Sequence, residues 1–212
     1  MPQKIAQPRQ KSAAQALRRL EKGNANFVND ELSHQLQDVS RRSELKKGQS
    51  PWAIVVTCAD SRVVPELIFD TGIGELFVVR VAGNVANTST LASVEYAVHN
   101  LGVKLIVVLG HEGCGAVKAA LDGNDLGYNL NHLLAHIKPA IEKPFKKKGN
   151  RMNEAVERNA LCAAQQLPGR SEIIRNAQRL KVVPAIYRLA TGEVDYLSVS
   201  YTHLTLPTNR EV

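Results

Sequence analysis

The stretch VVTCADSR, residues 55 to 62, places a thiol, a carboxylate and a guanidinium at alternate positions directly after an apolar run. Alternate residues of an extended chain lie on the same face. If the backbone stays roughly extended there, Cys58, Asp60 and Arg62 converge on one small volume. A thiol, a carboxylate and a guanidinium gathered at the end of a strand could form part of a functional site, and the rest of the chain must indicate what lies in that volume.

A second group of metal-ligand types lies in GHEGCG, residues 110 to 115. His111 and Cys114 are three residues apart on a glycine-rich turn between an apolar strand and a helix. With Cys58 they make two thiolates and one imidazole, a set of donors that suits zinc. Three protein ligands leave a fourth tetrahedral position for water or substrate, as in a catalytic rather than a structural zinc site. The alternative, three unrelated residues, is disfavoured by the neighbouring carboxylate and guanidinium.

Other residues of ligand type have plainer interpretations. His132 and His136 in HLLAH have a spacing that can bind zinc, but the segment lacks the glutamate of metalloproteases. We therefore interpret them as part of a polar helix face. Cys162 in ALCAAQ is interpreted as a helix packing residue.

Apolar runs and turn residues predict the elements that must position these side chains. Strands are expected over 52–58, 75–83, 103–111, 181–189 and 193–199, the first three buried, and helices over 12–29, 63–70, 89–102, 115–123, 128–141 and 152–180, the last broken at Pro168-Gly169. Strands alternating with helices indicate a largely parallel α/β sheet, whose working site lies beyond the carboxyl ends of the strands. Two of these strands end at Cys58 and at GHEGCG, and they can be neighbours in such a sheet.

Length and composition indicate one globular domain. The chain has 212 residues, 44% of them hydrophobic, and no apolar stretch approaches the length of a membrane span. Its start has no apolar region typical of a secretory signal, so we expect a cytoplasmic protein, or a periplasmic one if a leader was removed. Three cysteines cannot all pair, which favours reduced thiols or metal ligands.

The net charge of +7 raises the question of a nucleic-acid partner. The basic residues are spread along the chain, however, and the only dense run, Lys143 to Arg151, contains Pro144 and Gly149 and is typical of a solvated loop. We expect no nucleic-acid partner and no membrane association.

The segments CADSRVVPELIF, GELFVVRVAGN, SVEYAV and LIVVLGHEGCGAVKAAL resemble the β-class carbonic anhydrases. The resemblance implies one Zn²⁺ per chain, with Cys58, His111 and Cys114 as its ligands, and Asp60 and Arg62 as the catalytic dyad. It implies a lyase that hydrates carbon dioxide reversibly to bicarbonate and a proton through zinc-bound hydroxide.

The same resemblance implies a fold and an assembly. The expected fold is a mostly parallel four-stranded core sheet with an added antiparallel strand, flanked by helices, with an N-terminal helical arm laid across a partner. Residues 1–199 are expected to form one domain that includes the arm, residues 1–50, whereas residues 200–212 depart from the family and are interpreted as foreign or disordered. A homo-oligomer, a dimer or a tetramer, is expected, since the helix at 12–29 has no evident place inside a single domain.

One departure from the family concerns inhibition. In some members an arginine, a tyrosine and a tryptophan three residues before the first cysteine form an inhibitory bicarbonate site. Arg80 and Tyr187 resemble the first two, but residue 55 is valine, which argues against such a site here. Two alternatives to carbon dioxide hydration remain open. One is hydrolysis of carbon disulfide or carbonyl sulfide at the same zinc site; the other is a non-enzymatic zinc protein with an anionic partner, against which the Asp60–Arg62 pair argues.

Overall fold

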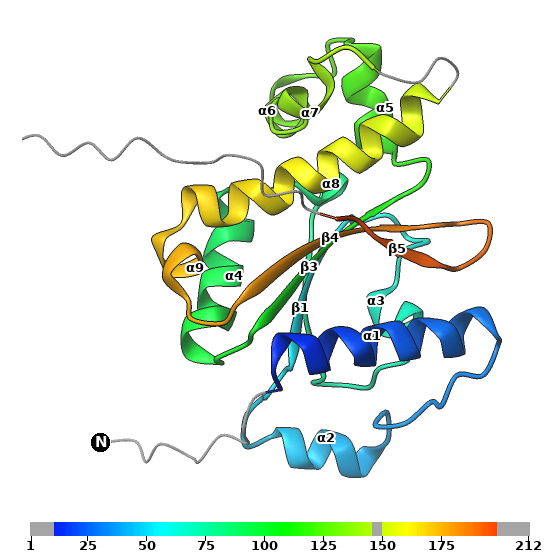
Figure 1. The fold of residues 1–212 in the computed structure, drawn as a ribbon, viewed down its shortest axis with the longest axis vertical. Helices are drawn as coiled ribbons and strands as arrows, with labels where there is room; N and C mark the ends of the chain where they lie inside the picture. Colours follow the sequence, from blue (N-terminus) through cyan, green and yellow to red (C-terminus); the bar gives the residue numbers. More distant parts are fainter. Residues whose placement is uncertain (1–10, 146–149, 199–212) are drawn as a thin grey trace, which may run out of the picture.

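A computed structural model describes residues 11–145 and 150–198, so the tail at 200–212 lies outside the described residues. Its five strands form one sheet in the order β2-β1-β3-β4-β5 (Figure 1). The strands are β1 Ala53–Thr57, β2 Leu76–Arg80, β3 Leu105–His111, β4 Lys181–Tyr187 and β5 Val194–Tyr196. The first four are parallel and β5 pairs antiparallel with β4, which confirms the predicted sheet.

Helices cover both faces of this sheet (Figure 1). They are α1 Ala13–Val28, α2 Val39–Leu45, α3 Pro65–Ile68, α4 Thr88–Asn100, α5 Gly115–Asp122, α6 Tyr128–Ala135, α7 Lys138–Ile141, α8 Arg151–Arg170 and α9 Glu172–Asn176, with a short 3₁₀ turn, η1, at Ala82–Asn84. Helices α4, α8 and α9 pack on one face, α1 and α3 on the other, and α5 to α7 lie beyond the carboxyl ends of the strands. In the described ranges, none of these helices has the length and apolar character that crossing a membrane requires.

Strand β1, which lies between β2 and β3, is buried on both faces because its side chains alternate between two cores. Ile54 and Val56 pack with α4 and α8, whereas Ala53 and Val55 pack with α1 and α3. The prediction that the second strand is equally buried is wrong. Among the described strands β2 pairs only with β1, and as an edge strand its first four residues are half-buried and Arg80 is exposed.

Two helical predictions differ from the structure in detail. Helix α8 continues through Pro168 to Arg170, because a proline in the last turn removes few hydrogen bonds of the helix. Arg175 donates to the carbonyl groups of Pro168 and Gly169 at 3.0 and 3.2 Å, and so satisfies acceptors that a helix end leaves unpaired. The helix expected over 128–141 is divided into α6 and α7.

Helix α1 lies on its own sheet, so the expectation that it has no place inside a single domain is wrong. Ala16 and Leu20 are fully buried in the core beneath it. The Asn24 side chain donates to the carbonyl groups of Ile68 and Gly192 at 3.2 and 2.8 Å and accepts from the Val194 N–H at 2.9 Å. These bonds connect α1 to α3 and to the β4–β5 hairpin.

Close packing of α1 against α3 makes Gly23 a test of this arrangement. A Cβ atom at residue 23 would overlap the carbonyl group of Phe69. Gly23→Ala should therefore lower the free energy of unfolding by about 1–3 kcal/mol, measured by urea denaturation, although alanine is the better helix former. Gly169→Ala is the matched control, because residue 169 is helical and faces open space. If Gly23→Ala were as stable as the control, this packing would be contradicted.

Candidate active site

The site forms where β1 and β3 end side by side. The chain leaves β1 for β2 on one side and returns to β3 on the other, so the connections diverge at this point of the sheet. The Thr57 hydroxyl donates to the Leu109 carbonyl oxygen at 2.8 Å and links the two strands near their ends. Cys58 directly follows β1 and His111 ends β3, as expected for neighbouring strands.

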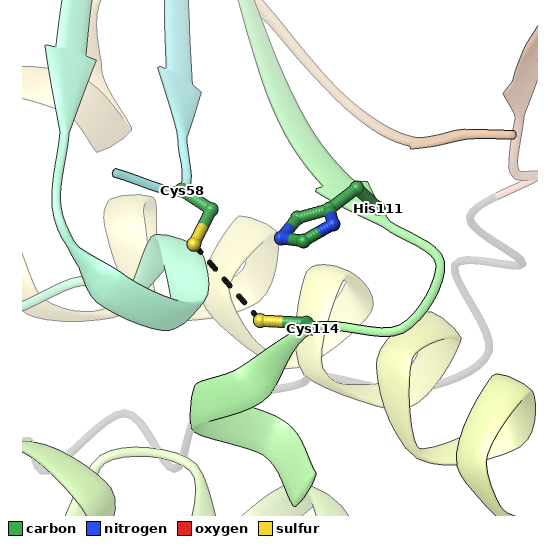
Figure 2. Close-up of side chains that lie close together, drawn as sticks. All are labelled: Cys58, His111 and Cys114. Carbon is green, nitrogen blue, oxygen red and sulfur yellow. Dashed lines mark hydrogen bonds between the residues drawn. The ribbon is translucent and has the colours of Figure 1, made fainter. Parts of the chain in front are cut away.

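Cys58, His111 and Cys114 point toward one another from these ends (Figure 2). Their ligand atoms all lie within 4.8 Å of one another, and all three residues are buried. Cys114 reaches the cluster because Gly113 takes a positive φ of 61° in the preceding turn, and Cys114 is then the N-cap of α5. Among the described residues this is the one group of three or more cysteine, histidine or acidic side chains close enough to hold a metal ion.

The imidazole of His111 is oriented by a backbone contact. Its Nδ1 lies 2.9 Å from the Glu112 carbonyl oxygen, which can only accept, so Nδ1 carries the proton. The other nitrogen, Nε2, then presents a lone pair, and it is buried without a hydrogen-bond partner among the described residues. Buried polar atoms are rarely left unpaired, and metal-bound histidines typically donate their other N–H as this one does. The geometry fits a metal ion at Nε2.

The two thiol groups shift each other's pKa. Their sulfur atoms lie 4.0 Å apart. A hydrogen bond from the Cys114 thiol lowers the pKa of Cys58 to about 4, although burial opposes the shift. The pKa of Cys114 is raised because its thiol donates to Cys58 and is itself buried. A divalent cation bound between the sulfurs would supply the charge needed to remove the second proton.

Asp60 and Arg62 form a bidentate ion pair beside the cluster. The Nε and Nη2 atoms of Arg62 donate to the two carboxylate oxygens at 2.9 and 2.8 Å. This pair holds the pKa of Asp60 well below its usual range, so the carboxylate stays ionised. Its Oδ2 atom lies 3.8 Å from Nε2 of His111, which places it next to the metal-facing atom.

The backbone at this pair is a turn, so the condition of a roughly extended chain from Cys58 to Arg62 is not met. β1 ends at Thr57, and the Val63 N–H donates to the Asp60 carbonyl at 3.1 Å. The Asp60 side chain also accepts from the Arg62 N–H at 3.0 Å, a contact typical of aspartate in turns. The turn folds Arg62 back, and the side chains converge by this route instead.

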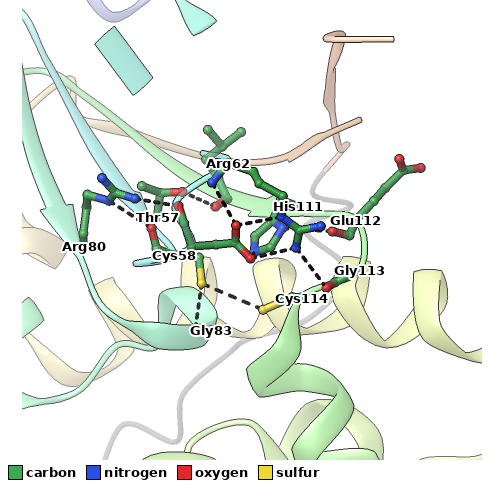
Figure 3. A network of polar contacts seen from close by, with 11 residues as sticks. Thr57, Cys58, Arg62, Arg80, Gly83, His111, Glu112, Gly113 and Cys114 are labelled. Carbon is green, nitrogen blue, oxygen red and sulfur yellow. Dashed lines mark hydrogen bonds and ion pairs between the residues drawn. The ribbon is translucent and has the colours of Figure 1, made fainter. Parts of the chain in front are cut away.

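Arg80 holds the same loop from β2. Its Nε and Nη2 atoms donate to the carbonyl oxygens of Cys58 and Asp60 at 3.1 and 2.7 Å (Figure 3). Tyr187, which resembles the second residue of an inhibitory bicarbonate site, is 6% exposed and lies with its ring 6.4 Å from that of Phe27. Val55 is fully buried in the centre of β1.

The remaining candidates lie away from the cluster. His132 is on α6 and His136 caps its end, with their rings 5.7 Å apart. Cys162 is half-buried on α8, where its sulfur accepts a hydrogen bond from Gln166. None of the three belongs to the metal-binding group found among the described residues.

Sequence reasoning missed the backbone groups that contact the ligands. The Gly83 N–H donates to the Cys58 sulfur at 3.3 Å (Figure 3). The only signal for this contact is a glycine in RVAGN directly after a strand, which identifies a turn but not what its N–H faces. Fold and site together define a mixed α/β protein with a buried cluster of two thiols and one imidazole that could hold a metal ion.

Comparisons with known proteins identify the family. A family model described as carbonic anhydrase matches residues 53–194. The carbonic anhydrase of Mycolicibacterium smegmatis is 40% identical over 190 residues, 86% of this chain and 92% of the relative. Carbonic anhydrase 2 of Mycobacterium tuberculosis is 39% identical over 84% of this chain and 89% of its own length. The Coccomyxa β-carbonic anhydrase, solved in complex with acetazolamide, matches with a TM-score of 0.68 at 27% identity over 83% of each chain. The chain belongs to the β-class carbonic anhydrase family.

The cluster predicts which side chains control metal content. Cys58→Ser, His111→Ala and Cys114→Ser should each sharply lower the metal bound per chain, because each removes one of three ligands. Metal analysis of purified protein by atomic emission measures this directly. Cys162→Ser is the matched control and should keep the wild-type content, because Cys162 lies outside the cluster. A fully loaded His111→Ala protein would overturn the ligand assignment.

Proposed function

We propose that this protein catalyses the reversible hydration of carbon dioxide to bicarbonate and a proton, with one zinc ion per chain. The observation that carries the proposal is the buried cluster of two sulfurs and an unpartnered imidazole nitrogen, with an ionised carboxylate beside it. When bound, zinc would supply a coordinated water that is far more acidic than free water. Cys58 and Cys114 would hold it as thiolates and His111 through Nε2.

Asp60 orients the reacting oxygen in this proposal. Its carboxylate is ionised, lies next to the metal-facing nitrogen of His111, and can therefore accept a hydrogen bond from a hydroxyl group bound there. Arg62 engages both carboxylate oxygens and so restrains Asp60 from turning onto the metal as a further ligand. Because carbon dioxide offers few groups to bind, positioning of this oxygen must contribute much of the rate.

Neither alternative function gains support. The relatives described above are named as carbonic anhydrases, none as a hydrolase of carbon disulfide or carbonyl sulfide. A non-enzymatic zinc protein would have no use for the Asp60–Arg62 pair, because a structural site needs only its ligands.

We also infer a homo-oligomer, a dimer or a tetramer, located in the cytoplasm. Among the described strands the outer side of β2 has no partner, so its backbone groups are available to another chain. Helix α2 has no buried residue and Val39 on it is 67% exposed, as expected for a helix that a partner covers. The arm across a partner would then use α2, because the inner face of α1 is already buried in its own chain.

Substitutions in the ion pair separate metal binding from catalysis. Arg62→Ala should keep zinc near its wild-type level, because Arg62 is not a ligand, yet reduce carbon dioxide hydration in stopped-flow assays. Losing a hydrogen bond to a charged group costs about 1.5–3 kcal/mol, or roughly 10- to 150-fold in rate if the contact acts only in the reactive arrangement. Asp60→Asn should also keep zinc and lose rate, since an amide is a poor zinc ligand.

The wild-type protein and Arg18→Ala serve as references in this experiment. Arg18 is exposed on α1 and belongs to neither the cluster nor the ion pair, so its substitution should change neither zinc content nor rate. Near-normal turnover of zinc-loaded Arg62→Ala would contradict the role of the pair. A zinc-loaded wild type that hydrates no carbon dioxide would contradict the proposed function itself.

A further prediction concerns inhibition by the product. We expect only ordinary product inhibition by bicarbonate, because Val55 has no ring N–H to donate and Arg80 is engaged with backbone carbonyl groups. Initial rates measured against bicarbonate concentration should follow a hyperbolic curve. Sigmoidal inhibition, or a bicarbonate ion found between Arg80 and Tyr187 in a crystal, would show the opposite.

A further inference from the structure

The Cys58 sulfur is hydrogen-bonded by the backbone as well as by its neighbour. The Gly83 N–H points at it over 3.3 Å, as Figure 3 shows. An N–H bond to a thiolate withdraws part of the negative charge that the sulfur would otherwise give to a metal. In a site with two thiolates this matters, because strong sulfur donors make a bound cation a weaker Lewis acid.

Gly83 has the geometry of a residue fixed for this contact. Its φ of 70° is positive, and the Asn84 N–H donates to the Val81 carbonyl at 2.9 Å to close the turn. A Cβ atom at residue 83 would lie 2.8 Å from Ile137 Cδ1 and 3.2 Å from Ala116 Cβ. The turn is therefore confined by α5 and by the residue that precedes α7, and it leaves no space for a side chain.

The carbonyl group of Gly83 accepts a hydrogen bond from a side chain in a distant part of the sequence. The Asn159 Nδ2 atom donates to the Gly83 carbonyl oxygen at 2.8 Å. Asn159 lies on α8 and is 2% exposed. The other buried residues of α8 are alanine, valine and leucine, so Asn159 is the polar exception on an apolar face. Burying an amide is costly unless it is hydrogen-bonded, so its bond to Gly83 is the reason that it is tolerated.

We propose that Asn159 is a positioning residue for the metal centre: by binding the Gly83 carbonyl group it fixes the backbone of that residue, so that the Gly83 N–H stays on the Cys58 sulfur. This inference rests on the proposed function, since it concerns the zinc that the cluster would bind. Asn159 touches neither metal nor substrate and acts through Gly83. Outer contacts of this kind change metal affinity or activity by about 10- to 100-fold when they are removed.

The test compares metal binding by two variants at residue 159 with that of a destabilised control. Asn159→Leu removes the donor at similar volume, and Asn159→Asp replaces it with an acceptor that repels the Gly83 carbonyl group. Leu167→Ala, also on α8 and fully buried but in a different part of the core, loses stability without touching the turn. Zinc affinity is measured by competition with a chelator, and the cobalt-substituted proteins are compared through their sulfur-to-cobalt charge-transfer absorption.

Both variants at residue 159 should bind zinc about 10- to 100-fold more weakly than wild type and shift the cobalt absorption, while Leu167→Ala changes neither. If one variant fails to fold, the other carries the comparison. Unchanged affinity and spectrum at residue 159, or an equal change in Leu167→Ala, would overturn the positioning role. These readouts need no carbon dioxide turnover. Failure of the proposed function would instead appear as zinc-loaded wild type without hydration activity.

Discussion

Two sulfur atoms held 4.0 Å apart in a buried site set the constraint on which the rest of the structure depends. Burial and mutual repulsion oppose charging both: the Cys114 thiol lowers the pKa of Cys58, whereas the pKa of Cys114 is raised. The unpartnered Nε2 of His111 faces the same space and completes three donors. A divalent cation bound between the sulfurs would relieve this repulsion. The surrounding contacts hold the three donors where it would bind.

The contacts that keep the donors in place mainly involve backbone groups. Arg80 holds the carbonyl groups of Cys58 and Asp60, the Glu112 carbonyl orients His111, and the Gly83 N–H contacts the Cys58 sulfur. Backbone groups have less freedom than long side chains, so contacts through them hold geometry at little entropic cost. The side chain of Asp60 is the exception, and it is restrained by Arg62. The three proposed ligands and Asp60, which we propose to orient the reacting oxygen, are therefore held by different contacts.

The sheet brings residues that are far apart in the sequence close together at this site. Cys58 and His111 are 53 positions apart, yet they meet because β1 and β3 are parallel neighbours in register from Ile54 with Ile106 to Thr57 with Leu109. The cores on both faces fix these strands, one beneath α4 and α8 and the other beneath α1. An error in this register would displace the ligands by a strand residue, about 3.3 Å, which is more than a metal–ligand bond tolerates.

The sequence by itself determined the class of fold, the approximate bounds of most strands and helices, and the cluster of Cys58, His111 and Cys114. These follow from local signals, because apolar runs, glycine stops and ligand types are properties of short segments. Tertiary structure alone decided that β2 is the edge strand and that α1 packs on its own sheet. It also decided that Asn159 meets Gly83, 76 positions away. Such contacts depend on how distant segments pack, and nothing in the residues near Gly83 or near Asn159 indicates the other.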